Sequence, residues 1–198
     1  MGVYTVVITG ASGSVYGLRL VEQLLVGGHG VTLIATEAGS QVMAHETGFN
    51  LPTENAAEAV RRYLEVGSDA LLRVVAPNDL FDPIASGSRR VDAMVVAPCS
   101  MGFVGSIAAG LGADLPERAA DVMLKERRPL VVVPRETPLS LIHLRNLTVI
   151  AEAGAIVVPA MPAFYQKPES LDDQVNFVVG KVLDVLGIEH SLYRRWRE

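Results

Sequence analysis

The sequence predicts a doubly wound α/β fold, in which helices cover both faces of an open parallel sheet. Three observations lead to this prediction. Six short runs rich in valine and isoleucine recur along the chain, without the polar–apolar alternation of a sheet that has one wet face. Amphipathic segments of helix length lie between these runs. Hydrophobic residues make up 49% of the 198 residues, which is enough for one well-packed core.

The apolar runs are the expected strands. They cover Tyr4–Thr9, Val31–Thr36, Leu72–Ala76, Ala93–Ala97, Pro129–Pro134 and Ala155–Pro159. Strands that are buried on both faces give continuous apolar runs of this kind. We expect Pro98 to end the fourth strand, because proline has no amide hydrogen to donate to a neighbouring strand.

The amphipathic segments between the strands are the expected helices. They cover Leu18–Val26, Ser40–Glu46, Asn55–Val66, Leu115–Arg127, Ser140–Ala153 and Asp172–Leu186. Strands that alternate with helix-length segments indicate crossover connections and therefore a parallel sheet. The longest irregular stretch, Pro77–Ser88, is too short to divide the chain, so we expect one domain over residues 1–198 with a tail at 185–198.

Composition and charge exclude several classes of protein. The net charge of -5 argues against a nucleic-acid surface, because polyanions select basic faces. The only cysteine, Cys99, excludes an intrachain disulfide and a cysteine metal cluster. The four histidines lack metal-ligand spacing, so no metal site is expected. The amino terminus enters a strand without a basic region, and no apolar run approaches the ~20 residues of a membrane helix, which indicates a cytoplasmic protein.

A glycine-rich turn follows the first expected strand. Gly10, Gly13 and Gly17 lie within TGASGSVYG, and glycine lets the backbone turn tightly and approach a ligand. The helix that follows directs free amides and the positive end of its dipole toward an anion. The turn therefore favours a phosphate site, although a serine-capped turn without a ligand has the same sequence.

The identity of the nucleotide does not follow from the turn. The spacing is not G-x-G-x-x-G, so the dinucleotide fingerprint is missing. The turn is similar to that of short-chain dehydrogenases, and Glu37 lies where a carboxylate could bind an NAD ribose. Those enzymes also carry a Tyr-x-x-x-Lys pair, and none of the five tyrosines has a lysine four residues later. The dehydrogenase interpretation therefore lacks its catalytic pair.

Small residues follow the fourth expected strand, in the segment APCSMG that ends at Gly102. Small residues there allow a ligand to approach the backbone, or begin a tightly packed helix. Cys99 is expected to be a small buried hydrophobe and not a nucleophile, because no histidine neighbours it in sequence.

Basic residues gather between residues 118 and 135. Arg118 and Lys125 are seven residues apart on one expected helix and share a face, while Arg135 and Glu136 follow the fifth strand. A solvated helix face is the simpler interpretation of Lys125. Basic residues beside a phosphate-binding turn suggest a second anionic group, such as a phosphorylated substrate. A carboxylate beside that anion, Glu136, could then act as a proton donor.

These segments together resemble the flavin prenyltransferases of the UbiX type, which are close relatives of the phenolic acid decarboxylase B subunits. The resemblance runs nearly end to end. It rests on TGASGSVYGLRL (9–20), ASGS (85–88), APCSMG (97–102), ERAADVMLKERRPLVVVPRETP (117–138), His143–Leu144 and PAFYQKP (162–168). The long central segment is specific, whereas the TGASG turn alone is not. The resemblance implies a Rossmann-like fold of the flavoprotein type.

The resemblance also implies an activity. The family joins a dimethylallyl group from dimethylallyl monophosphate to N5 and C6 of reduced FMN, without a metal ion. The product, prenylated FMN, is the cofactor of UbiD-type decarboxylases, with a part in ubiquinone biosynthesis. The same resemblance implies a homo-oligomer, a dodecamer, with sites at subunit contacts.

Residue roles follow from the resemblance position by position. Catalytic roles fall on Ser12, Glu46 and Glu136. The flavin would be held by Gly10, Ala11, Ser12, Thr36, Ser100, Met101, Gly102, Phe103, Arg118 and Arg135. The substrate phosphate would be held by Lys125, Arg135, Tyr165 and Lys181, and Trp196 in the tail would close over the site as a lid.

Two positions depart from the family pattern. Phe103 stands where a small hydroxyl residue is expected, and Lys181 stands where arginine is common, which replaces a two-point phosphate contact by a point charge. Two other functions stay open. One is an FMN-binding accessory partner of a decarboxylase, and the other is an FMN-dependent cysteine decarboxylase. The second lacks support here, because that family carries a Pro-Ala-Ser-Ala-Asn-Thr segment where this chain has Pro-Cys-Ser-Met-Gly.

Overall fold

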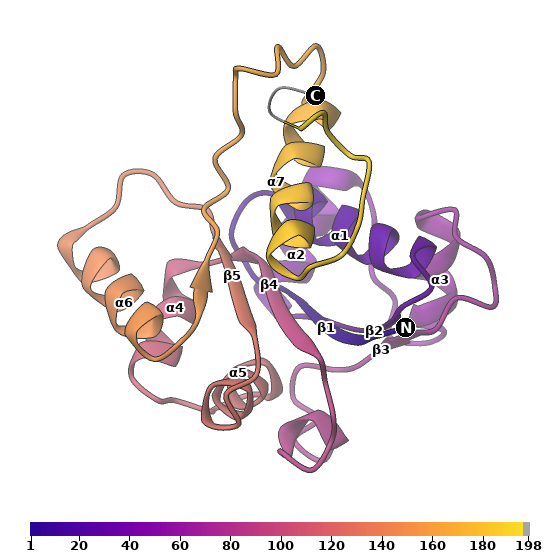
Figure 1. Ribbon diagram of the computed structural model, residues 1–198. Helices are drawn as coiled ribbons and strands as arrows, with labels where there is room; N and C mark the ends of the chain where they lie inside the picture. The colour runs from indigo at the N-terminus through magenta and orange to yellow at the C-terminus, as the bar shows by residue number, and fades with distance from the viewer. Residues whose placement is uncertain (196–198) are drawn as a thin grey trace.

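A six-stranded parallel sheet forms the centre of the computed structural model, which describes residues 1–195 (Figure 1). The strands stand in the order β3-β2-β1-β4-β5-β6. Their bounds are Val3–Ile8 (β1), Gly30–Ala35 (β2), Leu72–Val74 (β3), Ala93–Cys99 (β4), Leu130–Pro134 (β5) and Ile156–Val157 (β6). All five strand pairs are parallel, which confirms the predicted doubly wound fold.

Helices cover both faces of this sheet (Figure 1). Their bounds are Ser14–Val26 (α1), Glu37–Thr47 (α2), Ala56–Tyr63 (α3), Met101–Ala108 (α4), Leu115–Lys125 (α5), Leu141–Glu152 (α6) and Leu171–Val185 (α7), with a short 3-10 turn at Pro83–Ala85 (η1). Helices α1 and α7 pack on one face, and α4, α5 and α6 pack on the other.

The core consists of two layers, one on each face of the sheet. Within β1, Val6 and Ile8 belong to the layer under α1 and α7, while Val7 belongs to the layer under α4 and α5. All three side chains are fully buried. Successive residues of a strand point to opposite faces, so a strand covered on both sides must be apolar throughout. This is why the sequence shows valine and isoleucine runs without alternation.

The strand order changes direction between β1 and β4. Ligands of this fold bind outside the carboxyl ends of the strands at such a switch point. Helix α1 packs closely there, because a Cβ atom at Gly17 would lie 2.2 Å from the carbonyl oxygen of Ala97. Gly17 therefore brings the start of α1 against the end of β4.

Several details differ from the sequence prediction, and β6, for example, covers only Ile156–Val157. Pro98 does not end the fourth strand, and β4 continues to Cys99. The proline has no amide to donate, but its carbonyl oxygen accepts hydrogen bonds from the Thr9 amide at 3.3 Å and the Thr9 hydroxyl at 2.8 Å. Helix α4, which the sequence suggested only as one alternative, forms directly after that strand. Within residues 1–195, no helix has the length and apolar character needed to cross a membrane.

Candidate active site

The carboxyl ends of β1 and β4 are joined through one side chain, that of Thr9. Its hydroxyl donates to the Pro98 carbonyl oxygen at 2.8 Å and accepts from the Ser100 amide at 2.8 Å. Thr9 is buried, so both bonds are sheltered from water. The turn that begins at Gly10 and helix α4, which Ser100 caps, therefore leave the sheet side by side.

The glycine turn after β1 is anchored by Glu46 from the end of α2. The Gly13 amide donates to both carboxylate oxygens of Glu46 at 3.0 Å, and the Ser14 amide donates to one of them at 2.9 Å. Gly13 has φ 106°, a left-handed conformation that favours glycine. Burial would raise the pKa of Glu46, but hydrogen bonds from Ser12, Ser14 and Gly13 outweigh it and lower the pKa.

This arrangement revises one expectation. The amides at the start of α1, which the sequence analysis assigned to a phosphate, bind the Glu46 carboxylate instead. A helix amino terminus favours a carboxylate for the same electrostatic reason that it favours phosphate. The turn therefore brings Ser12 and Glu46 together, and their catalytic roles stay a prediction.

The expected flavin-binding residues beyond the turn lie at the starts of α2 and α4. The Thr36 hydroxyl accepts from the Gly39 amide at 3.0 Å, and the Ser100 hydroxyl accepts from the Phe103 amide at 3.2 Å, so each caps a helix. Gly102 is exposed, whereas the side chains of Met101 and Phe103 are only 5% and 7% exposed and pack in the core. Phe103 thus contributes its bulk to the layer beneath α4.

Tyr16, on the first turn of α1, lies beside Glu46 and Arg135, and the sequence analysis gave it no role. Burial raises the pKa of its phenol, the Arg135 guanidinium lowers that pKa, and the Glu46 carboxylate raises it. Both charges therefore lie close enough to act on Tyr16. Only its place inside the glycine motif could have marked this residue, since a tyrosine on a helix is usually a packing residue.

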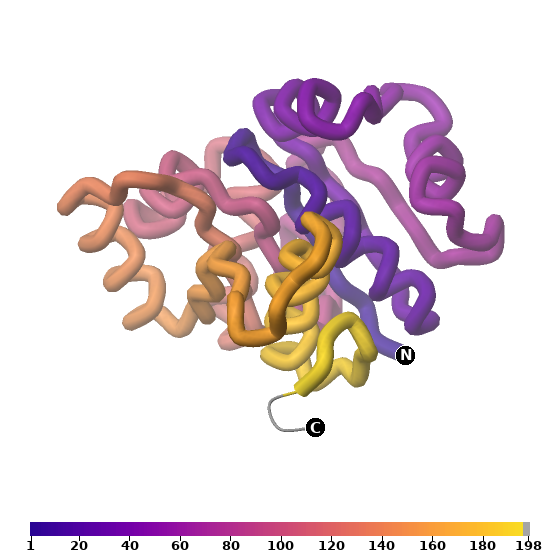
Figure 2. Tube along the Cα trace, turned by 90° about the horizontal axis from the view of Figure 1, so that it is seen from above, coloured from indigo at the N-terminus to yellow at the C-terminus, as the bar shows by residue number. Residues whose placement is uncertain are grey.

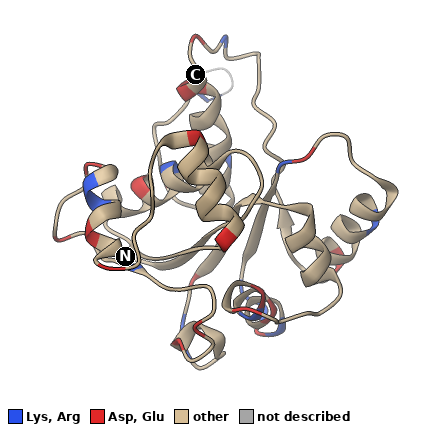
Figure 3. Ribbon diagram, turned by 180° about the vertical axis from the view of Figure 1, so that it is seen from behind, with Lys and Arg blue, Asp and Glu red and all other residues tan. Residues whose placement is uncertain are grey.

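Arg135 and Glu136 leave the sheet at the end of β5. The Arg135 amide donates to the Cys99 carbonyl oxygen at 3.3 Å, which fixes the start of this loop beside the end of β4. The Glu136 carboxylate accepts from the Thr137 amide at 3.0 Å, and both side chains are exposed. Charged residues lie on helices and loops around the sheet and not within its central strands (Figure 3).

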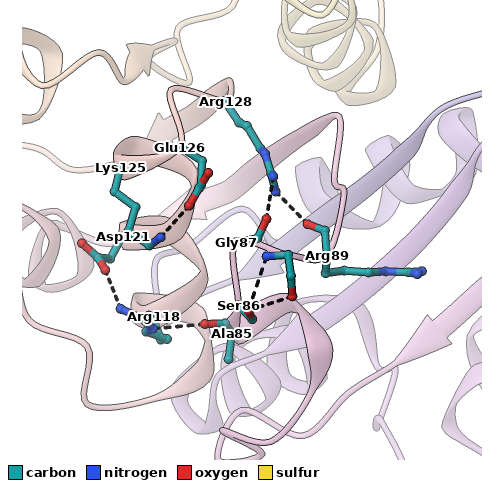
Figure 4. A network of polar contacts seen from close by, with 10 residues as sticks. Ala85, Ser86, Gly87, Arg89, Arg118, Asp121, Lys125, Glu126 and Arg128 are labelled. Carbon is teal, nitrogen blue, oxygen red and sulfur yellow. Dashed lines mark hydrogen bonds and ion pairs between the residues drawn. The ribbon is translucent and has the colours of Figure 1, made fainter.

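Arg118 and Lys125 both lie on α5 and make their contacts away from the glycine turn. Arg118 donates to the Ala85 carbonyl oxygen at 3.1 Å and pairs with Asp121 at 2.7 Å, and Lys125 pairs with Glu126 at 2.6 Å (Figure 4). Among the described residues, no hydrogen bond or ion pair joins either cation to the glycine turn. Figure 1 shows α5 at the opposite end of the sheet from the loop that follows β5. The expected gathering of these cations beside the turn therefore does not occur within one chain.

The loop that carries the ASGS motif is held against α5. The Arg128 guanidinium donates to the carbonyl oxygens of Gly87 and Arg89, each at 2.7 Å (Figure 4). A Cβ atom at Gly87 would lie 2.2 Å from a carboxylate oxygen of Glu126, so a larger residue there would require the Glu126 side chain to move. The sequence analysis gave the residues of this motif no role, although Arg118 and Arg128 hold the loop at Ala85 and Gly87.

The remaining expected residues belong to α7 and to the loop before it. Tyr165 packs edge-on against Phe177 with ring centroids 6.1 Å apart, and Lys181 pairs with Asp184 at 3.4 Å. Trp196, the expected lid, lies outside the described residues. Figure 2 shows the loop of residues 159–170 beside the carboxyl-terminal segment.

Cys99 lies at the end of β4 with no exposed surface. Burial raises the pKa of its thiol, so the nucleophilic thiolate is strongly disfavoured. Within residues 1–195, no group of three His, Cys, Asp or Glu side chains is arranged to hold a metal ion.

The residues at the switch point fit a flavin mononucleotide. The amides of Met101 and Gly102 begin α4, where no described residue bonds to them, and the Arg135 cation lies at the end of the neighbouring strand. Free helix-terminal amides and a guanidinium suit a phosphate, and the hydroxyls of Ser12 and Thr36 suit the polar edges of a ring and its ribityl chain.

Comparison with known proteins gives the same assignment. The family model named Flavoprotein matches residues 3–183. The chain is 48% identical to the flavin prenyltransferase UbiX of Halalkalibacterium halodurans over 197 residues, which covers 100% of this chain and 94% of that protein. It is 45% identical to the flavin prenyltransferase UbiX of Pseudomonas aeruginosa, with 98% of this chain and 93% of that protein covered.

Solved structures agree. The crystal structure of AnUbiX (PadA1) in complex with FMN and dimethylallyl pyrophosphate superposes with a TM-score of 0.88 at 36% identity, covering 100% of this chain and 98% of the other. The dodecameric FMN-dependent UbiX-like decarboxylase from Escherichia coli O157:H7 gives a TM-score of 0.87 at 39% identity, covering 99% and 100%. The chain therefore belongs to the flavoprotein family and, within it, to the flavin prenyltransferases of the UbiX type.

Proposed function

We propose that this chain is a cytoplasmic flavin prenyltransferase that joins a dimethylallyl group from dimethylallyl monophosphate to N5 and C6 of reduced FMN. The product, prenylated FMN, would pass to a UbiD-type decarboxylase. The observation that carries the proposal is the 48% identity to a flavin prenyltransferase over the whole chain. The position of Ser12 and Glu46 at the switch point supports it, because that is where this fold holds its ligand.

The flavin would lie between the starts of α1, α2 and α4. When bound, reduced FMN supplies the two ring atoms that accept the dimethylallyl group. Gly10, Ala11 and Thr36 would line the flavin site where β1 and β2 end. The segment 100–103 would line it where β4 ends. The hydroxyl of Ser12, hydrogen-bonded to the Glu46 carboxylate, could move a proton at the edge of the ring.

Cations would stabilise the leaving phosphate without a metal ion. Arg135 extends from the end of β5, while Tyr165 and Lys181 extend from the loop before α7 and from α7 itself. A guanidinium and an ammonium suit the charge of a monophosphate. Glu136, beside Arg135, would exchange the proton that accompanies phosphate release and ring closure.

Arg118 and Lys125 would reach a site only across a subunit contact. Their network with the ASGS loop has no described bond to the glycine turn of the same chain. We therefore place this cluster at the site of a neighbouring copy, in a homododecamer like that of the E. coli protein. Exposed apolar side chains on and beside α6 support assembly, and they are Leu139, Leu141, Ile142, Leu144 and Val149.

The test is anaerobic incubation of the protein with reduced FMN and dimethylallyl monophosphate, followed by mass analysis of the released flavin. We expect a flavin that is heavier by one five-carbon prenyl unit, formed equally well with EDTA present. Loss of activity with EDTA would contradict metal independence. Unmodified FMN, together with tight FMN binding, would instead support an accessory partner of a decarboxylase.

A further inference from the structure

Asp184, in the last turn of α7, gathers four side-chain donors. It accepts from the Tyr193 hydroxyl, from His190 Nε2 at 3.2 Å and from Arg195 Nη2 at 3.0 Å. Lys181, one turn earlier on the same helix, places its Nζ 3.4 Å from Oδ2 of Asp184, the oxygen that also accepts from Tyr193. Three of these partners belong to the segment that follows α7. One carboxylate thus holds the carboxyl-terminal segment on the helix that carries Lys181.

The packing around this carboxylate is close. A Cβ atom at Gly180 would lie 2.5 Å from the Tyr193 ring and 2.7 Å from the His190 ring, so the helix leaves room for both rings. The His190 side chain is only 2% exposed. A segment without secondary structure is therefore held at a defined place on α7, with the His190 side chain buried and Arg194 and Arg195 exposed.

The same segment contacts the loop that carries Tyr165. Tyr193 and Tyr165 both pack on Phe177, with ring centroids 5.1 Å and 6.1 Å away. The Gln166 side-chain amide donates to the Arg194 carbonyl oxygen at 2.6 Å. Figure 2 shows the two segments side by side. Tyr165 and Lys181 are thus linked to one docked segment.

The carboxylate is charged under ordinary conditions. Burial would raise the pKa of Asp184, but the hydrogen bonds from Tyr193, His190, Arg195 and Lys181 outweigh it and lower the pKa to about 2. Charge-assisted hydrogen bonds of this kind are stronger than neutral ones. Removal of the charge at constant shape should therefore loosen the segment.

We propose that Asp184 is a positioning residue, which docks residues 190–195 on α7 and thereby fixes Lys181 and the Tyr165 loop for the phosphate of the prenyl donor. The part that concerns the phosphate rests on the proposed function. The docking itself does not, so the two can fail separately.

The first experiment compares Asp184→Asn with the unmodified protein in limited trypsin digestion, followed by intact mass. Trypsin cleaves after Arg194 and Arg195, and a docked segment resists it. We expect cleavage there to accelerate about tenfold, the effect of losing one charge-assisted bond. Asp172→Asn is the matched control, because it changes the same residue type at an exposed position of the same helix. Its digestion should match the unmodified protein.

The second experiment measures steady-state kinetics. With Asp184→Asn we expect the KM for dimethylallyl monophosphate to rise about tenfold while kcat changes little, because a misplaced cation weakens phosphate binding. Tyr193→Phe keeps the ring on Phe177 and removes the hydroxyl, so it should give smaller changes in the same direction.

Each outcome decides a part of the proposal. Unchanged digestion in both Asp184→Asn and Tyr193→Phe would overturn the docking role, and if Asp184→Asn does not fold, Tyr193→Phe decides alone. Faster digestion with an unchanged KM would overturn the positioning role. If the unmodified protein transfers no prenyl group, the proposed function fails, and digestion still tests the docking.

Discussion

At the scale of single residues, the site depends on where one carboxylate lies. Glu46 ends an expected helix, and apart from the family resemblance nothing in the sequence places that helix near the glycine turn. In the folded chain its carboxylate binds the amides of Gly13 and Ser14. The pairing satisfies amides that a helix start leaves without partners, and it fixes the hydroxyl of Ser12 nearby.

The first residue-scale prediction concerns Glu46→Gln. The pKa of Glu46 in the folded protein lies below its unfolded value of 4.5. The carboxylate therefore stabilises the fold at pH values above 4.5, and this contribution is lost as the pH falls through the folded pKa. We expect Glu46→Gln to lower Tm by about 2–4 °C at pH 7, since exposed charged hydrogen bonds contribute about 1 kcal/mol after solvent screening. The difference should shrink below pH 4.5.

Thermal unfolding at several pH values measures this, with Glu54→Gln in the exposed loop before α3 as the control. An equal Tm for Glu46→Gln and the unmodified protein at pH 7 would show that the carboxylate does not hold the turn. The variant should also slow prenyl transfer while FMN still binds.

At the scale of elements, α5 and the ASGS loop behave as one unit. Arg128 follows α5 and donates to two carbonyl oxygens of the loop, at Gly87 and Arg89. Arg118, within α5, donates to a third, at Ala85. The two elements are about 30 residues apart in sequence, and these three bonds set the loop against the helix.

The element-scale prediction is that Arg128→Lys loosens the loop, whereas Arg127→Lys does not. Lysine has one ammonium group and cannot reproduce the two-point contact of a guanidinium. Arg127 is the neighbouring residue and its side chain is exposed, so it provides a matched control. We expect amide hydrogen exchange at residues 86–90 to rise about tenfold in Arg128→Lys, as the loss of one hydrogen bond implies. Equal exchange in both variants would contradict this role.

At the scale of the whole molecule, the exposed face of α6 is the feature that a single chain leaves unexplained. Leu141 and Ile142 are 62% and 67% exposed, and only Ile150 of this helix is buried. Helices in a parallel α/β fold normally bury an apolar stripe and expose polar residues. An exposed apolar stripe is typical of a subunit contact.

The molecule-scale prediction is that Ile142→Lys dissociates the assembly. Each copy would place an uncompensated charge where it otherwise buries an isoleucine, which contributes about 1.5–3 kcal/mol. Light scattering should give a large oligomer for the unmodified protein and a smaller species for the variant. Val26→Lys, on an equally exposed apolar residue of α1, should leave the oligomer intact. A monomeric unmodified protein would contradict the proposed dodecamer.

The sequence alone determined the fold and the family of this protein. A strand covered on both faces must be apolar throughout, so the runs around Val6 and Val95 predicted the sheet correctly. The motifs around Gly10 and the segment 117–138 predicted the family, because chain-long motifs carry more information than any one turn.

Only the tertiary structure decided how the site is built. It placed Glu46 on the amides of the turn and brought Tyr16 under the influence of Arg135, and it placed Arg118 and Lys125 on a helix away from that turn. Spacing along a chain fixes which face of one helix a residue occupies, but not which other element that face meets. Those contacts depend on how separate elements pack, and this is decided only when the whole core forms.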